Sequence, residues 1–372
     1  MEQLLDRKRH FDNLDATRFI AFIPVFLTHC FFTSDKDISR SSLYYFFEDH
    51  VKIGLIGLDY FFVLSSFLIT WIILEEYDLS GKFRIMNFWV RRCLRIWPLY
   101  FLMVALGFTW FYLSNTIHPG SVEPLPEWYN FIFFTLNFYS VKHGIAFLFF
   151  LTIFWSVSIE EQFYLVWALL LRFAKKFFVL FCIALIITSL VFRWLMFDEN
   201  NSLVFHTFSA LGNFAIGALV AYACYYKNGF YQYIRTMTKN MIALVYFLFG
   251  LCVIFYSSLF AVRIGVVPER LLFACFYGFI IAEQSFATNS LFKLGGNKKI
   301  NYLGTISFGL YCYHGVVITL FAKLGELYGW DKSEWHVFIL NPSIAFVLTI
   351  VMALLSYEWF EKRILKLKYK YY

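Results

Sequence analysis

The sequence predicts an all-α, polytopic integral membrane protein, and two observations lead to this fold class. Of the 372 residues, 60% are apolar and 15% are charged, and the mean hydropathy is +0.63; soluble domains have about 45–50% apolar and about 25% charged residues. The apolar residues also gather in runs of about 20, the length that a helix needs to cross a bilayer. A net charge of +7 spread thinly over such a chain excludes a disordered protein and a nucleic-acid partner.

About ten apolar runs are long enough to span a membrane. We expect transmembrane helices at 14–33, 54–74, 98–114, 155–171, 177–196, 208–226, 240–260, 265–285, 302–322 and 338–360. The stretch 128–150 is apolar but is interrupted by Lys142-His143-Gly144, which favours a re-entrant segment shielded by other helices. No internal repeat is visible, so residues 1–372 are expected to form one transmembrane domain. The seven cysteines form no CxxC pair, which predicts small buried side chains and no metal site.

Lysine and arginine are distributed asymmetrically between the connections. With a cytoplasmic N-terminus, 22 of the 32 fall in inside segments, 9 in outside segments and one, Arg18, within the first helix. Cytoplasmic loops carry an excess of these residues, so we expect both termini in the cytoplasm. The outside count includes Arg193 and Arg270. The charged N-terminus has no small-residue cleavage site, so no cleavable signal peptide is expected.

Several ionisable residues lie inside the predicted helices, where they are costly and usually face a cavity. Arg18 and His29 are 11 residues apart, which places them on one face of the first helix, about 16.5 Å apart along its axis. Asp59 and Glu160 fall in the outer part of their helices, and His314 falls near the middle of its helix. A buried structural hydrogen bond explains any one of these residues equally well, but their convergence at one depth favours a polar chamber.

A basic cluster precedes the third predicted helix. Arg91, Arg92 and Arg95 are three or four residues apart, so a helix brings them together in one cationic patch at the cytoplasmic face. Arginine binds phosphate through paired hydrogen bonds, which suits a polyphosphate ligand. Taken alone, the cluster is more typical of a positive-inside anchor on anionic lipid.

Six motifs follow one another along the chain. They are Arg18-x10-His29, Gly57-x-Asp59-x-Phe61-Phe62-x-Leu64-Ser65-Ser66-Phe67, Arg92-x-x-Arg95-Ile96-x-Pro98-x-Tyr100, Trp155-Ser156-Val157-x-x-Glu160-Glu161-Gln162-Phe163-Tyr164, Ser307-Phe308-Gly309-Leu310-Tyr311-x-x-His314 and Ser356-Tyr357-x-x-x-Glu361. In this order they resemble the membrane-bound acyltransferase-3 family, whose members acylate carbohydrates and similar acceptors. Each motif is weak alone, whereas the ordered set covers nearly the whole chain and is specific.

Three residues depart from the family pattern. Ser66 replaces a glycine, Arg363 replaces a proline, and Asn213 stands where some relatives have aspartate. None of them touches the pair Arg18 and His29, so we do not infer an inactive protein.

The resemblance implies an O-acyltransferase that moves an acyl group, most simply acetyl, from cytoplasmic acyl-CoA to a hydroxyl of a cell-surface saccharide or its lipid-linked precursor. His29 is then expected to be the base, because an unperturbed imidazole titrates near neutral pH. Arg18 would bind a pantetheine carbonyl or stabilise the oxyanion, and Asp59 or Glu160 would hold the imidazole or bind sugar hydroxyls.

The same resemblance sorts the other candidates by ligand. Acyl-CoA contacts are expected from Arg91, Arg92, Arg95 and Ser65, and acceptor contacts from Glu160, His314, Trp155 and Tyr164. Acetyl-CoA is expected as a co-substrate, with no bound cofactor and no metal. The expected location is the bacterial cytoplasmic membrane.

Other functions fit the same composition. A transporter or flippase would also place about ten helices around a polar chamber, although such folds often carry an inverted repeat that this sequence lacks. An acyltransferase acting on a lipid or a small molecule also fits, because aromatic residues, 23% of the chain, pack against lipid as well as sugar. Direct transfer is the simplest route, since a covalent acyl group on Ser65, Ser156 or a tyrosine has no G-x-S-x-G elbow to support it.

Overall fold

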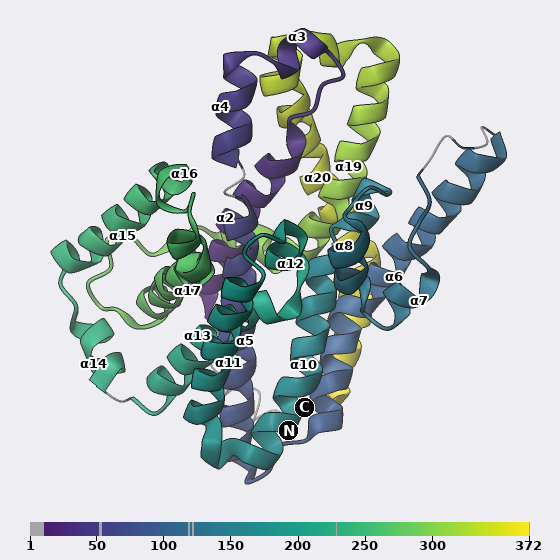
Figure 1. The fold of residues 1–372 in the computed structure, drawn as a ribbon. Helices are drawn as coiled ribbons and strands as arrows, with labels where there is room; N and C mark the ends of the chain where they lie inside the picture. Colours follow the sequence, from purple (N-terminus) through teal and green to yellow (C-terminus); the bar gives the residue numbers. More distant parts are fainter. Residues whose placement is uncertain (1–10, 52–53, 118–119, 121–122, 228, 372) are drawn as a thin grey trace. The chain divides into compact units, whose positions relative to one another are not determined.

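A computed structural model describes residues 11–51, 54–117, 120, 123–227 and 229–371 (Figure 1). Every regular element within these ranges is a helix, so the predicted all-α class is confirmed. The expectations about a signal peptide and about the basic N-terminal residues fall largely on residues 1–10, which lie outside the described ranges.

Seven helical segments are long and apolar enough to cross a membrane. They are Ile56–Ser80, Ile85–Ile117, Lys175–Leu195, Asn200–Tyr225, Arg263–Phe286, Ser307–Tyr328 and His336–Tyr371. The pair α14 (Gly229–Thr236) and α15 (Lys239–Ile254), bent by 98°, forms an eighth candidate. The chain is therefore a multi-pass membrane protein.

Each of the ten predicted spans falls on a helix. The two that lie outside the seven segments and the bent pair are α2 (Asp12–Cys30) and α10 (Trp155–Ala174), with 19 and 20 residues. Both are long enough to cross but carry charged residues in their N-terminal halves. The stretch 128–150 forms the short helices α7 (Trp128–Ile132) and α8 (Leu136–His143) and the start of α9 (Phe149–Thr152), none of them long enough to cross. The number of crossings and the sides of the termini stay predictions.

The described chain divides into two compact units, and each is built from three separate stretches. Unit 1 comprises residues up to Ala21, Ile56–Ile85 and Glu160–Gly304, and unit 2 comprises Phe22–Leu55, Met86–Ile159 and Thr305–Tyr372. Helices α2 and α10 each contribute one part to unit 1 and the other part to unit 2. The prediction of a single domain stays a prediction.

In unit 1, α13 (Thr207–Tyr225) packs against α11 (Phe178–Leu195) and α17 (Arg263–Phe286). It also approaches α5 (Gly54–Ser80) closely, because the hydroxyl of Ser66 donates a hydrogen bond to the carbonyl oxygen of Phe214. Ser66 is fully buried. The serine that departs from the family glycine therefore joins two helices through a bond that glycine cannot make.

In unit 2, α19 (Ser307–Tyr328) packs against α20 (Asn341–Ser356) and α9. A Cβ on Gly315 would lie 2.9 Å from Cα of Phe150, so the absence of a side chain lets α9 approach α19. Helix α19 ends at Gly329, whose φ of 70° is the left-handed conformation that glycine adopts without strain. The stretch 128–150 is tied to α6 (Ile85–Ile117) by a 2.9 Å hydrogen bond from the hydroxyl of Tyr100 to the carbonyl of Phe131.

The close approach of α13 to α5 gives a first prediction. A Cβ at Gly217 would lie 2.1 Å from the carbonyl oxygen of Val63, so Gly217→Ala must push the helices apart. We expect a loss of about 1–3 kcal/mol, the usual result of overpacking, measured by thermal unfolding in detergent. Gly250→Ala in α15 is the matched control, because nothing lies within 4 Å of its added Cβ. Equal melting temperatures for the two variants would contradict the packing described for unit 1.

Candidate active site

Unit 2 brings two of the predicted site histidines into contact. His29 lies in the last turn of α2 and His314 lies in α19, and their rings stack with centroids 5.7 Å apart and an interplanar angle of 29°. The ring of Phe149 lies 5.0 Å from that of His29, and the ring of Phe22 meets His314 edge-on at 5.7 Å. The two imidazoles, expected from separate segments to share one chamber, therefore lie side by side among aromatic rings.

The surroundings of His314 determine which of its nitrogens carries a proton. Its Nδ1 lies 2.5 Å from the carbonyl oxygen of Tyr311. A carbonyl only accepts hydrogen bonds, so Nδ1 must be the donor and the neutral ring keeps a free lone pair on Nε2. This Nε2 is buried and has no hydrogen-bond partner among the described residues.

Tyr311 in turn fixes α19 against the start of α10. Its hydroxyl lies 2.6 Å from the carbonyl oxygen of Ile153, to which it donates, and 2.7 Å from the hydroxyl of Ser156. Trp155, expected to contact the acceptor, is the neighbouring residue and is buried in unit 2. The carbonyl that orients His314 is thus itself held by a hydrogen-bonded side chain.

Unit 1 gathers three other candidates into one chain of hydrogen bonds. Tyr164 donates through its hydroxyl to Oγ of Ser65 at 3.2 Å, and Ser65 donates to Oε1 of Glu160 at 2.8 Å. Ser65 was expected to contact acyl-CoA, whereas Glu160 and Tyr164 were expected to contact the acceptor. Their contacts place all three in one polar cluster. Elsewhere in unit 1, Arg18 forms an ion pair with Asp15, one turn earlier in α2.

The basic cluster lies in unit 2 on the first turns of α6. Arg91 is buried and donates to the carbonyl oxygen of Tyr371, and the guanidinium of Arg92 lies 5.6 Å above the ring of Phe88. The charges of Arg92 and Arg95 both act on Lys368 in the C-terminal segment. The cationic patch is therefore larger than the sequence motif, because the C-terminal segment adds a lysine to it.

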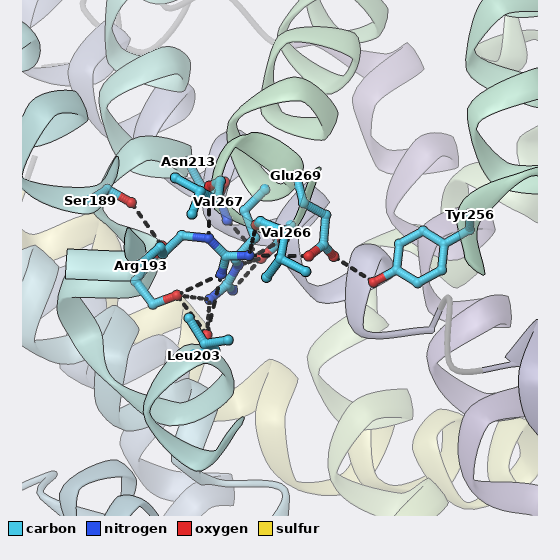
Figure 2. A network of polar contacts seen from close by, with 11 residues as sticks. Ser189, Arg193, Leu203, Asn213, Tyr256, Val266, Val267 and Glu269 are labelled. Atoms are coloured by element: carbon cyan, nitrogen blue, oxygen red, sulfur yellow. Dashed lines mark hydrogen bonds and ion pairs between the residues drawn. The ribbon is translucent and has the colours of Figure 1, made fainter. Parts of the chain in front are cut away.

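A buried ionic network in unit 1 surrounds Asp59 (Figure 2). Its other charged members, Arg193, Glu269 and Arg270, were missing from the sequence-based candidates. Arg270 of α17 donates through Nε to both carboxylate oxygens of Asp59, at 3.0 Å each, and its NH2 group forms an ion pair with the same carboxylate. Asn213 of α13 donates to Oδ1 of Asp59 at 2.6 Å. Asp59 was expected to hold the imidazole of His29 or to bind sugar, but these contacts lead us to propose a structural role for its carboxylate.

A second arginine completes the network. Arg193 of α11 pairs with Glu269 of α17 at 3.1 Å and donates to Oγ of Ser209 at 2.9 Å, as Figure 2 shows in part. Tyr256 donates its hydroxyl to the other oxygen of Glu269. Burial, together with the nearby Glu269 charge, raises the pKa of Tyr256 well above its usual value, so this hydroxyl stays a donor. Two arginines and two carboxylates thus balance in charge.

This network corrects one part of the sequence analysis. Arg193 and Arg270 were counted as cations of outside loops, but they are only 3% and 9% exposed and lie within α11 and α17. Without these two residues, seven of the nine cations remain in outside segments, so the excess of lysine and arginine in inside segments grows. Both residues already lay within the predicted spans 177–196 and 265–285, and this position was the signal that could have revealed them.

Comparison with known proteins identifies the family. A family model described as an acyltransferase domain, acyltransferase-3, matches residues 11–358. The chain belongs to the acyltransferase-3 family. The resemblance drawn from the six motifs is therefore confirmed over nearly the whole chain. No solved structure matches the chain.

Relatives among curated proteins carry names that agree with this family. The chain is 25% identical to "Peptidoglycan O-acetyltransferase OatA" of Listeria monocytogenes, over 96% of this chain and 56% of that protein. It is 28% identical to "Putative peptidoglycan O-acetyltransferase YrhL" of Bacillus subtilis, over 84% of this chain and 50% of that protein. The chain thus spans about half the length of the curated relatives it matches.

The Asp59–Arg270 pair gives a second prediction. Asp59→Ala should lower the free energy of unfolding by about 3–5 kcal/mol, because it leaves a buried guanidinium unpaired. The double variant Asp59→Ala, Arg270→Met should recover part of this loss, since both charges are then gone. The exposed pair Arg263–Asp198 supplies the control: Asp198→Ala should change stability by about 0–1 kcal/mol. Unfolding in detergent measures all three, and an Asp59→Ala variant as stable as Asp198→Ala would contradict a structural ion pair.

Proposed function

We propose that this membrane protein is an O-acetyltransferase that moves an acetyl group from cytoplasmic acetyl-CoA to a hydroxyl of a cell-wall saccharide. The contact between His29 and His314, in a chain of the acyltransferase-3 family, is the observation that carries the proposal. The names of the curated relatives supply the saccharide class. The bacterial cytoplasmic membrane is the matching location, because acyl-CoA and the wall saccharide then reach the protein from opposite faces.

His29 is the proposed base. The acceptor oxygen attacks the thioester carbonyl while its proton passes to the imidazole of His29; the carbon–sulfur bond then breaks, and the CoA sulfur leaves with the proton. A positioned base of this kind contributes about 10²–10⁴-fold to the rate. The side chain of His29 is half-buried, whereas His314 is fully buried, so His29 is the more accessible of the two imidazoles.

The donor side is proposed to lie at the basic cluster. Arg92, Arg95 and Lys368 gather positive charge at the start of α6, and the phosphates of CoA need such a partner. Arg91 already donates to a backbone carbonyl, so we assign it to holding the C-terminal segment against α6. The excess of inside lysine and arginine favours the cytoplasmic side for this cluster.

The other predicted contacts stay proposals. Ser65, Glu160 and Tyr164 form one hydrogen-bonded cluster; Glu160 and Tyr164 are proposed to contact the acceptor, and Ser65 the acyl-CoA. Arg18 is proposed to face the thioester carbonyl. A transporter or flippase without acyl chemistry is not favoured, because the family match covers residues 11–358.

The proposed base gives a third prediction. His29→Ala should reduce acetyl transfer to a saccharide acceptor by at least a hundredfold while the melting temperature stays near that of the wild type, because a half-buried ring is lost without leaving a buried charge. Release of CoA thiol in detergent measures the rate. His143→Ala is the control, since this exposed histidine lies on α8, outside the proposed site. Retention of more than a tenth of the wild-type rate in His29→Ala would exclude His29 as the base.

The basic cluster gives a fourth prediction. The double variant Arg92→Ala, Arg95→Ala should bind acetyl-CoA more weakly and show a flatter salt dependence, because phosphate contacts are lost. Calorimetry with CoA and dephospho-CoA should also show less discrimination between the two ligands than in the wild type. Arg84→Ala, an exposed arginine just before α6, is the matched control. Unchanged CoA affinity in the double variant would return the cluster to the role of a lipid anchor.

A further inference from the structure

Several buried side-chain nitrogens of unit 2 have no hydrogen-bond partner among the described residues, and Nε2 of His314 is the one that lies beside the proposed base His29. Nε2 of His314 is buried in the free protein and accepts no hydrogen bond from any described residue, while Nδ1 of the same ring donates to the carbonyl of Tyr311. A buried polar atom without a partner destabilises a fold, so such atoms are rare and need an explanation. The lone pair on Nε2 therefore lacks a hydrogen-bond donor among the described residues.

A trapped water is a poor explanation for this nitrogen. Buried waters usually make about three hydrogen bonds, but the rings packed around His314 are those of Phe22, Phe149, His29 and Tyr311. Of their polar atoms, the hydroxyl of Tyr311 is already bonded to the carbonyl of Ile153 and the hydroxyl of Ser156, which leaves the imidazole nitrogens of His29. A role in packing alone is also insufficient, because an apolar ring would fill the same space without an unpaired acceptor.

The two stacked imidazoles together set a requirement on the ligand. The hydroxyl that becomes acylated has a single proton, and under the proposed function this proton goes to His29. It cannot at the same time bond to Nε2 of His314. If both stacked rings serve one acceptor molecule, that molecule must therefore present a second donor besides the hydroxyl that is acylated.

We propose that His314 is a specificity-determining residue, whose Nε2 accepts a hydrogen bond from a second donor of the acyl acceptor, a hydroxyl or an amide N–H close to the hydroxyl that is acylated. The inference rests on the proposed function and adds the substrate feature that the site recognises. Saccharides carry such neighbouring donors on adjacent ring carbons, whereas a simple alcohol or a lipid with one hydroxyl does not. The site thereby selects sugars over single-hydroxyl acceptors.

The selection follows from the cost of an unpaired acceptor. An acceptor molecule that lacks the second donor leaves Nε2 buried and unbonded, as it is in the free protein, and so gains nothing from that contact. A site built to bond a substrate group rejects the analogue that lacks it. One such hydrogen bond corresponds to a difference of about tenfold to a hundredfold in kcat/KM.

The test compares acceptors as well as variants. Purified full-length protein in detergent receives acetyl-CoA and either a peptidoglycan disaccharide or each of its monodeoxy derivatives, and kcat/KM is measured for each. For one monodeoxy derivative that keeps the reactive hydroxyl, the kcat/KM of the wild type should be about tenfold to a hundredfold lower than for the parent sugar. His314→Phe keeps an aromatic ring on His29 and should abolish this preference. His314→Gln restores an acceptor oxygen near the position of Nε2 and should keep most of it.

The outcomes separate the two levels of the proposal. A preference that is equally strong in His314→Phe and in the wild type would overturn the role of His314 while leaving the acetyltransferase intact, because a merely structural residue changes the rate for all acceptors alike. The same holds if no reactive monodeoxy derivative is discriminated by the wild type. Absence of acetyl transfer to every sugar in the wild type would instead overturn the proposed function.

Discussion

The cost of leaving a charge or polar group unpaired in a bilayer is the constraint on which this structure depends. In unit 1 the response is neutralisation: Arg193, Arg270, Asp59 and Glu269 balance in charge and share hydrogen bonds across α5, α11, α13 and α17. Each ion is expensive to bury alone and tolerable when paired. The network therefore joins these four helices through paired side chains.

Unit 2 responds to the same constraint differently. A neutral imidazole needs no counter-ion, so the rings of His29 and His314 can pack among phenylalanine rings. One nitrogen, Nε2 of His314, is nevertheless left without a partner. The ionic network also contains an unpaired buried atom, Oδ1 of Asn213, but Nε2 of His314 is the one that lies beside the proposed base His29. We therefore assign the paired ions of unit 1 to holding helices together and the unpaired nitrogen of His314 to a ligand.

Much of this arrangement follows from the sequence. Each of the ten apolar runs became a helix, and the interruption at 142–144 correctly marked a stretch that does not form a long helix. His29 and His314 were expected in one polar chamber, and the structure brings their rings into contact. Which side chains pair between helices could not be predicted from the sequence, because hydropathy and spacing give the depth of a residue but not the neighbouring helix that its side chain faces. Asp59 was expected to hold the imidazole of His29 or to bind sugar, and its ion pair with Arg270 was not predicted, because the loop count concealed both buried arginines.

The protonation of His314 is the most direct test of this division, because the open lone pair exists only in one form of the ring. Nitrogen-15 NMR of histidine-labelled protein in lipid nanodiscs reports that form, with His314→Phe identifying the signal among the eight histidines. The structure predicts a neutral ring that is protonated on Nδ1 and bare on Nε2. A ring protonated on Nε2, or on both nitrogens, would contradict the account of an acceptor position kept open for the substrate.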